Sequence, residues 1–320
     1  MRCAMTVRSI QPSPVRPGRL SVAGLVARAG WSRLAIYLLL TLGALGAVFP
    51  FIYMITTSLK TYGSVITGNL WPWPPLGAET LQWKNYADAI DAIGWDKQWG
   101  MYLFFRYAIN SIFVTLAVVA GVMITSVLAA YAFAQMHVPG KNFLFILLLA
   151  TIMIPGDLTI VPKAVMMYQF KNPFGPGSWY NNYLALIVPF LASVFGIFLL
   201  RQFFMQIPQD LFDAALIDGS GHTRYLLTIA LPLSRPALVS VALINFIWAL
   251  DSFKWPLLVT RDSNMRVLAV GLQQFLVQEG GTKIQLMMAF SSMVVVPVIV
   301  FYFFTQQYFT QGITTTGLKG

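Results

Sequence analysis

Charged side chains are scarce in this chain of 320 residues. Asp, Glu, Lys and Arg together make up 10% of the sequence, whereas hydrophobic residues make up 57% and the mean hydropathy is +0.68. Soluble globular domains carry about 25% charged residues. The composition therefore excludes an ordinary soluble domain and predicts an all-α integral membrane protein, because a helix satisfies its own backbone hydrogen bonds inside the bilayer.

Cysteine and histidine are also rare, which excludes two classes of site. The single cysteine, Cys3, cannot form an intramolecular disulfide. His137 and His222 have no neighbouring ligands at the spacing of a zinc site, so we expect no bound metal. The segment from Asp218 to His222 does not match the Gly-x-Ser-x-Gly turn of serine hydrolases, so we expect no catalytic residues and no enzyme activity.

Two further absences concern the source of energy. The chain has no Gly-x-x-x-x-Gly-Lys-Ser/Thr loop, since Gly140-Lys141 is followed by Asn142, and we expect neither a nucleotide nor another cofactor on it. The central parts of its apolar stretches lack the ionisable side chains that ion-coupled carriers keep there at a cost of roughly 2.5 kcal/mol or more. Energy for uphill transport must therefore come from elsewhere.

Six apolar stretches are long enough to cross a bilayer, which takes about 20 residues. They are predicted at residues 34–57, 107–134, 143–161, 183–200, 236–259 and 286–309. Such a chain is a multi-pass protein whose surroundings are lipid.

A basic arm, residues 1–33, precedes the first stretch and carries arginines but no acidic residue. It has little to bury, so we expect it to be disordered or to lie on the lipid headgroups. Because positive charge stays on the cytoplasmic side, both termini are predicted to be cytoplasmic. The net charge of +10 lies largely in this arm and forms no patch with interleaved aromatics, so we expect no binding to nucleic acid.

A stripe of small residues marks the second stretch. Ala117, Gly121, Thr125 and Ala129 recur every four residues, so they share one face of a helix. Small side chains let helix backbones approach closely. The stripe predicts a tightly packed neighbouring helix, by default one of this chain.

Near the end of the fifth stretch, polar residues support two hypotheses. Asn245, Trp248 and Asp251 could face a polar substrate pathway. Alternatively, Asp251 and Lys254 share a helix face and form an interfacial ion pair anchored by tryptophans. The residues by themselves favour neither hypothesis.

The polar segment between the fourth and fifth stretches, residues 201–235, is predicted to form two short helices. Pro208 suits the first turn of the first helix, and Gly219 can end it. The second runs from about residue 222 to 230 and stops at Pro232, after which Ser234 is expected to cap the fifth span. The first helix is too short to be stable alone, so it must dock on a partner or on this chain's own spans. Its apolar stripe consists of Leu211, Phe212, Ala215 and Leu216.

The spacing of this segment matches a known motif. Asp213-Ala214-Ala215, Gly219 after three residues, Ile229 after nine more and then Leu231-Pro232 resemble the EAA loop of binding-protein-dependent ABC transporter permeases, whose pattern is E-A-A-x3-G-x9-I-x-L-P. Only the Glu differs, being replaced by Asp213.

Further stretches are similar to the six-span subunit of maltose and multiple-sugar permeases. They are Trp255 to Leu258, Met265 to Leu272 and the C-terminal Gln311 to Gly320. The resemblance covers most of the chain beyond residue 33, and it implies a type I ABC importer fold with a permease domain at residues 34–320.

The resemblance also implies a function. The chain would be the permease subunit of an ATP-driven importer for a carbohydrate or, alternatively, for a non-sugar solute such as glycerol-phosphate or a polyamine. Its partners would be a second permease subunit, two ATPase subunits that hold ATP and Mg²⁺, and an extracytoplasmic solute-binding protein, at a bacterial or archaeal inner membrane. A membrane enzyme or a stand-alone channel is the alternative from another class.

Residues 201–235 would then couple the spans to the ATPase as a cytoplasmic coupling helix, and the loop at 260–285 would reach toward the binding protein. The coupling residues implied by the resemblance are Asp213, Ala214, Ala215, Asp218, Gly219, Ile229, Leu231 and Pro232.

Overall fold

The computed structural model describes residues 22–67, 81–175, 177–276 and 283–314. They belong to two units, divided between Tyr53 and Met54. The predictions for residues 1–21 of the basic arm and for residues 315–320 of the C-terminal tail lie outside these ranges.

Helix α1 (Val22–Ser58) forms the described part of the first unit and continues into the second. It begins at Val22, so residues 22–33 of the arm are helical and not disordered, while the expectation that the arm lies on the lipid headgroups stays a prediction. Residues 22–33 include good helix formers such as Leu25, Ala27 and Arg28. A continuous helix also bonds backbone groups that a helix starting at residue 34 would leave free at its end.

The second unit is almost entirely helical, with a single two-stranded hairpin among its described residues. Strand β1 (Trp95–Asp96) pairs antiparallel with β2 (Met101–Tyr102), a small departure from the predicted all-α fold. The helices before the hairpin are α2 (Tyr62–Ile66) and α3 (Lys84–Ile93). After it come α4 (Leu103–Gln135), α5 (Lys141–Ala150), η1 (Thr151–Met153), α6 (Gly156–Gln169), α7 (Tyr183–Ile187), η2 (Val188–Phe190), α8 (Val194–Phe204), α9 (Gln209–Ile217), α10 (His222–Tyr225), η3 (Leu226–Ala230), α11 (Leu231–Leu233), α12 (Arg235–Leu250), α13 (Lys254–Val259), η4 (Ser263–Met265), α14 (Leu268–Gly271), η5 (Leu272–Phe275) and α15 (Ile284–Thr314).

Four helical stretches in the described part of the chain are long and apolar enough to cross a membrane. They are Arg33–Ser58, Leu103–Gln135, Tyr183–Phe204 and Ile284–Phe304. Two further pairs of helices meet this test only together, and they are bent by 95° and 81°. By length and composition, the described residues therefore contain four candidate spans, or up to six if each bent pair counts as one.

Breaks after Met153 and Leu250 correct the predicted third and fifth spans. The third, predicted at residues 143–161, breaks after Met153, and α6 leaves at 95° to α5. Pro155 causes this break, because a proline disfavours helical backbone at the preceding residue, and Ile154 has a ψ of 113°. The fifth, predicted at 236–259, ends at Leu250, and α13 is a separate helix.

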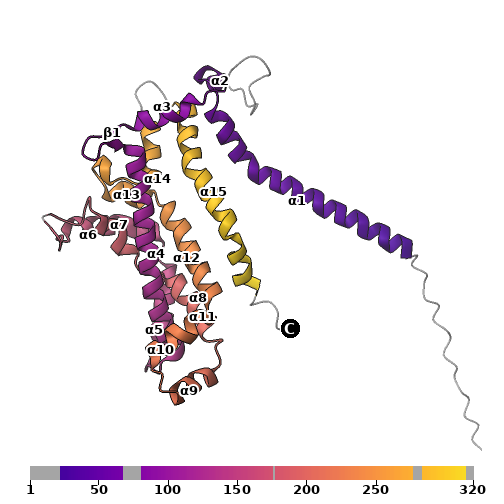
Figure 1. Cartoon of the computed structure of the whole chain (residues 1–320), viewed down its shortest axis with the longest axis vertical. Helices are drawn as coiled ribbons and strands as arrows, with labels where there is room; N and C mark the ends of the chain where they lie inside the picture. Colours follow the sequence, from indigo (N-terminus) through magenta and orange to yellow (C-terminus); the bar gives the residue numbers. More distant parts are fainter. Residues whose placement is uncertain (1–21, 68–80, 176, 277–282, 315–320) are drawn as a thin grey trace, which may run out of the picture. The chain divides into compact units, whose positions relative to one another are not determined.

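Helix α4 lies at the centre of the second unit. In Figure 1 it runs from the end with α3 and β1 to the end with α9 and α10. Val118, Val122 and Ala130 of α4 are buried in the larger hydrophobic core, which also includes residues of α8 and α12. These three helices thus share one core.

The small-residue stripe of α4 packs closely against this chain, as predicted, although its neighbour is a turn and not a helix. A Cβ at Gly121 would overlap the side chain of Leu191, which lies in the turn between η2 and α8. Thr125 donates a hydrogen bond from Oγ1 to the carbonyl oxygen of Leu191 at 2.6 Å. The stripe therefore accommodates a break in the fourth predicted span rather than a regular helix.

Replacing Gly121 by valine is expected to destabilise the protein by about 1–3 kcal/mol, because the added atoms must displace Leu191. Thermal unfolding of the purified protein in detergent would measure the loss. Adding Leu191→Ala should restore part of it, whereas Gly63→Ala in α2, where nothing lies within 4 Å, should change little. Equal unfolding midpoints for Gly121→Val and the unmodified chain would contradict this packing.

Candidate coupling segment and substrate groove

Helix α9 forms the first half of the predicted coupling segment. Pro208 occupies its N-cap position, and the helix ends in a turn that needs glycine. Gly219 has a φ of 78°, in the left-handed region, and its N–H donates to the Leu216 carbonyl at 3.0 Å. The Ser220 N–H donates to the Ala215 carbonyl at 2.8 Å. These two bonds form a Schellman cap, so the glycine of the motif is explained by backbone geometry.

The inner face of α9 packs on its own chain. Phe212 and Ala215 are buried, and the Phe212 ring stacks on His222 with centroids 4.9 Å apart. The edge of Phe212 meets Tyr225 at 5.0 Å, and Tyr225 is fully buried. Part of the predicted docking is therefore intramolecular.

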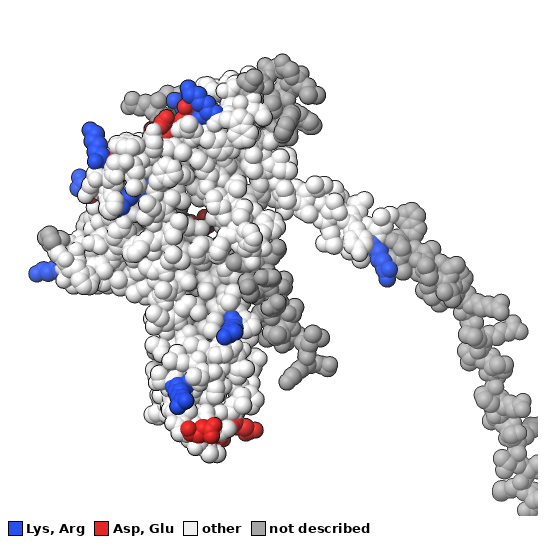
Figure 2. All heavy atoms as spheres, viewed as in Figure 1, with Lys and Arg blue, Asp and Glu red and all other residues white. Residues whose placement is uncertain are grey.

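The outer face of α9 is exposed and acidic. Figure 2 shows acidic side chains gathered at this end of the second unit. Asp213 and Ala214 of the motif are exposed, and so are Leu211 and Leu216 of the apolar stripe, which do not dock on this chain's own spans. Ile217 is 86% exposed. Together with Leu211 and Leu216 it gives this short helix a group of exposed apolar side chains, and grouped exposed apolar residues are typical of a surface that binds a partner. The exposed acidic residues are Asp210, Asp213 and Asp218.

The second half of the motif shapes the connection to α12. The helix from α10 widens into a π-helix, η3, just before Leu231-Pro232. Proline lacks an N–H and its ring excludes the carbonyl four residues earlier, which accounts for this local change. Ile229 and Leu231 are half-buried and pack against the larger core, whereas Pro232 is exposed.

The chain then bends by 81° into α12. Ser234 stands at the N-cap of α12, but its side chain makes no capping hydrogen bond, so this part of the prediction is wrong. N-cap residues usually have an extended backbone. Ser234 does not, since its φ is −97° and its ψ is 13°. The bend thus follows from a tight turn rather than from a side-chain cap.

The three predicted pathway residues line one groove. Asn245, Trp248 and Asp251 border an open cavity of about 1040 Å³ between α6, α12 and α13. Asn245 donates from Nδ2 to the Val241 carbonyl at 2.8 Å, which fixes the side chain on α12. The structure therefore brings together the residues that the pathway hypothesis names.

The charged residues of the groove pair differently from the prediction. Lys254 binds both carboxylate oxygens of Asp157 at 3.1 Å, and this is the ion pair found among the described residues. Asp251 does not share a helix with Lys254, because α12 ends there with Asp251 as its C-cap. The hypothesis of an Asp251–Lys254 pair is therefore wrong. Asp157 lies in the first turn of α6, where an acidic residue is favourable.

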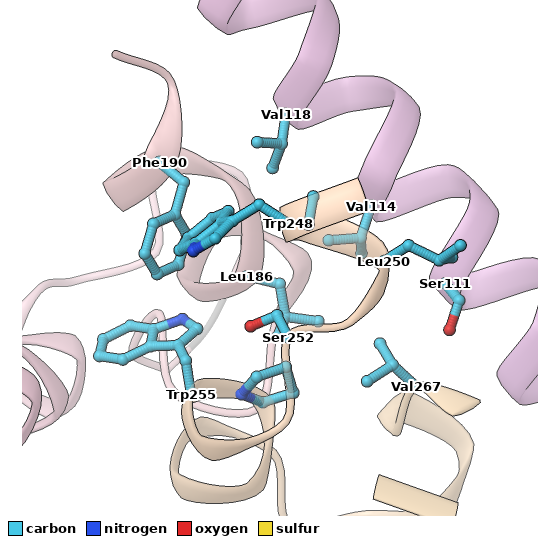
Figure 3. Close-up of a pocket in the computed structure, with 12 residues that line it drawn as sticks. Ser111, Val114, Val118, Leu186, Phe190, Trp248, Leu250, Ser252, Trp255 and Val267 are labelled. Atoms are coloured by element: carbon cyan, nitrogen blue, oxygen red, sulfur yellow. The ribbon is translucent and has the colours of Figure 1, made fainter. Parts of the chain in front are cut away.

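Aromatic rings form one wall of the groove. The Phe190 ring lies 5.0 Å from Trp248 and 5.5 Å from Trp255. Trp255 is buried and donates from Nε1 to the Ala185 carbonyl at 2.8 Å, whereas Trp248 is half exposed. Figure 3 shows these three rings beside a small apolar cavity that reaches Val114 and Val118 of α4.

Sequence reasoning missed several residues at both places. Asp157 and Phe190 of the groove, and Tyr131 beside His222, come from elements far apart in the chain. Pro155 marked the break that exposes Asp157, but its effect on the direction of α6 depends on tertiary packing. The sequence predicts His222 at the start of the second short helix, but it gives no sign of the contact with Tyr131.

The contacts of Trp255 and Lys254 are expected to differ in strength. Trp255→Phe leaves a buried carbonyl without its donor and should cost about 1–3 kcal/mol. Lys254→Met removes an exposed ion pair and should cost at most about 1 kcal/mol. Chemical or thermal unfolding of the two purified variants would measure both. A larger loss for Lys254→Met would show that the ion pair, not the indole, holds the groove wall.

A family model described as "Binding-protein-dependent transport system inner membrane component" matches residues 121–315, which include the coupling segment and the groove. The arabinooligosaccharides transport system permease protein of Halalkalibacterium halodurans is 30% identical over 286 residues, covering 88% of this chain and 96% of the relative. The sn-glycerol-3-phosphate transport system permease protein of Rhizobium meliloti is also 30% identical over 286 residues, covering 89% and 97%.

A solved structure of a bacterial ABC transporter involved in the import of the acidic polysaccharide alginate has a similar fold. The TM-score is 0.70 at 22% identity, and the match covers 93% of this chain and 100% of the other. At this identity the likeness shows the fold alone. The family match and the relatives together show that this chain belongs to the inner membrane components of binding-protein-dependent transport systems.

Proposed function

We propose that this protein is the permease subunit of an ATP-driven importer and that its solute is a carbohydrate delivered by an extracytoplasmic binding protein. The observation that carries the proposal is the coupling segment. Its motif spacing coincides with a capped helix whose inner face is packed and whose outer face is exposed. Such a helix is suited to transmit force, because it is held on one side and free to bind on the other.

The proposed assembly follows from the family. A second permease subunit would complete the pathway, and two ATPase subunits would hold ATP and Mg²⁺. The acidic and apolar outer face of α9 would enter a cleft on one ATPase, with Ile217 as the apolar contact. This arrangement puts both termini of the chain in the cytoplasm and the segment after α13 on the opposite side.

The groove supports a carbohydrate as the solute. Aromatic rings pack well on the apolar faces of sugar rings, and Trp248 is exposed to the groove beside Phe190. The charges that border it balance, with Lys163 and Lys254 against Asp157 and Asp251. Lys254 is already paired, so the groove offers a phosphate little unpaired positive charge.

A phosphorylated polyol is the second candidate, because a relative named for sn-glycerol-3-phosphate is as similar as one named for arabinooligosaccharides. The solute bound by the binding protein encoded beside this chain distinguishes the two, and we expect an uncharged sugar. Calorimetric titration of that protein with neutral oligosaccharides and with glycerol-3-phosphate would measure it. Binding of glycerol-3-phosphate alone would favour the second candidate.

Replacing Gly219 tests the coupling role. Gly219→Val forces a β-branched residue into the left-handed region. We expect uptake to be lost and fewer ATPase subunits to copurify, at an unchanged amount of protein in the membrane. Gly219→Asn is the matched control, since asparagine tolerates this conformation, and it should keep most of the uptake. Unchanged uptake in Gly219→Val would contradict the coupling assignment.

A further inference from the structure

We propose that α4 is a rigid strut that carries movement of the coupling segment to residues 263–272 at the opposite end of the unit. Tyr131 joins it to the coupling segment through His222, and Asn110 joins it to the distal segment. The proposal rests on the coupling function proposed above and adds the residues through which this chain would transmit the movement.

The contact at the coupling end passes through two rings. The Tyr131 hydroxyl and His222 Nδ1 lie 3.0 Å apart, within hydrogen-bond distance. The His222 ring also stacks on Phe212 of α9. Tyr131 is itself buried and meets the ring of Phe204 in α8 edge-on. A shift of α9 therefore moves Phe212 and His222, and it must either move Tyr131 or break its hydrogen bond.

The contact at the distal end depends on one buried amide. Asn110 is fully buried, and its Nδ2 donates to the carbonyls of Asn264 at 2.8 Å and Arg266 at 2.9 Å. Its Oδ1 accepts a hydrogen bond from the Tyr183 hydroxyl at 2.7 Å. One residue along α4, the Ser111 hydroxyl accepts from the Leu268 N–H at 2.8 Å. These bonds tie the path of residues 264–268 to α4.

Between the two contacts α4 has no break. Asn110 and Tyr131 are 21 residues apart (131 − 110), which corresponds to about 32 Å along a helix that rises 1.5 Å per residue. The helix contains no proline, and its middle is packed in the core of the unit. Close-packed interiors transmit displacement rather than absorb it. The neighbouring spans, in contrast, are broken at Pro155, at Ser193 and at Ser234.

The coupling end also shows signs of a place that changes shape. The Tyr225 hydroxyl lies in the same aromatic cluster, is buried and has no hydrogen-bond partner among the described residues. The π-helix η3 starts at the next residue. Unsatisfied buried groups call for an explanation, and π-helices are frequent at functional sites. Both features fit a cluster that rearranges when α9 moves.

Hydrogen–deuterium exchange of the transporter purified with its ATPase subunits tests the proposal, with MgATP and vanadate as the probe. In the unmodified complex we expect the probe to change exchange both in α9 and in residues 263–272. In Tyr131→Phe, which removes only the hydroxyl, the change in α9 should persist. The change at 263–272 should fall at least about threefold.

His222→Phe, which keeps a ring against Phe212 but removes Nδ1, is a second variant and should behave alike. Because the two residues share one contact, the double variant should be no worse than either single one. Tyr62→Phe, on the exposed helix α2, is the matched control and should respond as the unmodified complex does. A purely structural role of Tyr131 would instead raise exchange without ATP and reduce the response of both segments.

The possible failures are distinguishable. If the unmodified complex responds in neither segment, the proposed coupling function itself is contradicted. If it responds in α9 but not at 263–272, or if both variants keep the full response at 263–272, the coupling function stands and the strut is overturned.

Discussion

Backbone carbonyls left free by broken helices must find donors inside the protein, because lipid offers none. The second unit meets this constraint with polar side chains of its one unbroken central helix. Along α4, Asn110, Thr125 and Gln135 each donate to a carbonyl of a broken or ending element, at Asn264, Leu191 and Phe204. These bonds satisfy carbonyls in the distal segment, in the turn before α8 and at the end of α8. The same side chains hold those elements on α4, so the helix that satisfies the breaks also connects them.

The breaks explain why the groove and the protruding α9 occur where they do. At Pro155 the chain turns and presents the first turn of α6, with Asp157, to the groove. At Asp251 it ends α12 and lets Lys254 reach Asp157 from α13. At Gly219 and Ser234 it detaches two short helices from the spans and leaves the outer face of α9 free. A bundle of straight spans would satisfy its backbone hydrogen bonds within each helix, but it would offer neither a groove nor a protruding segment.

The sequence could predict those structural features that residues close together in the chain determine. The Schellman cap at Gly219 and the start of α9 after Pro208 were predictable, because neighbouring residues determine them. The stripe around Gly121 was predictable as a close contact, although not as a contact with a turn. The Lys254–Asp157 pair joins residues 97 positions apart, and Tyr131 meets His222 across 91. Such pairs depend on the direction that each helix takes after a break, and tertiary packing determines that direction. The expected Asp251–Lys254 pair failed for that reason, since it assumed an unbroken helix.

The structure shows where the replacement of the motif's Glu by Asp213 lies. The carboxylate stands on the exposed face of α9, away from the buried Phe212 and Ala215, so its shorter side chain costs this chain no packing. The Schellman cap and the aromatic cluster do not involve it. Under the proposed coupling role, the loss of one methylene would matter only where the outer face of α9 contacts a partner. A partner that bonds this carboxylate must bring its donor closer to the helix axis. Under the proposed coupling role, the change would affect the fit between two subunits rather than the fold of this one.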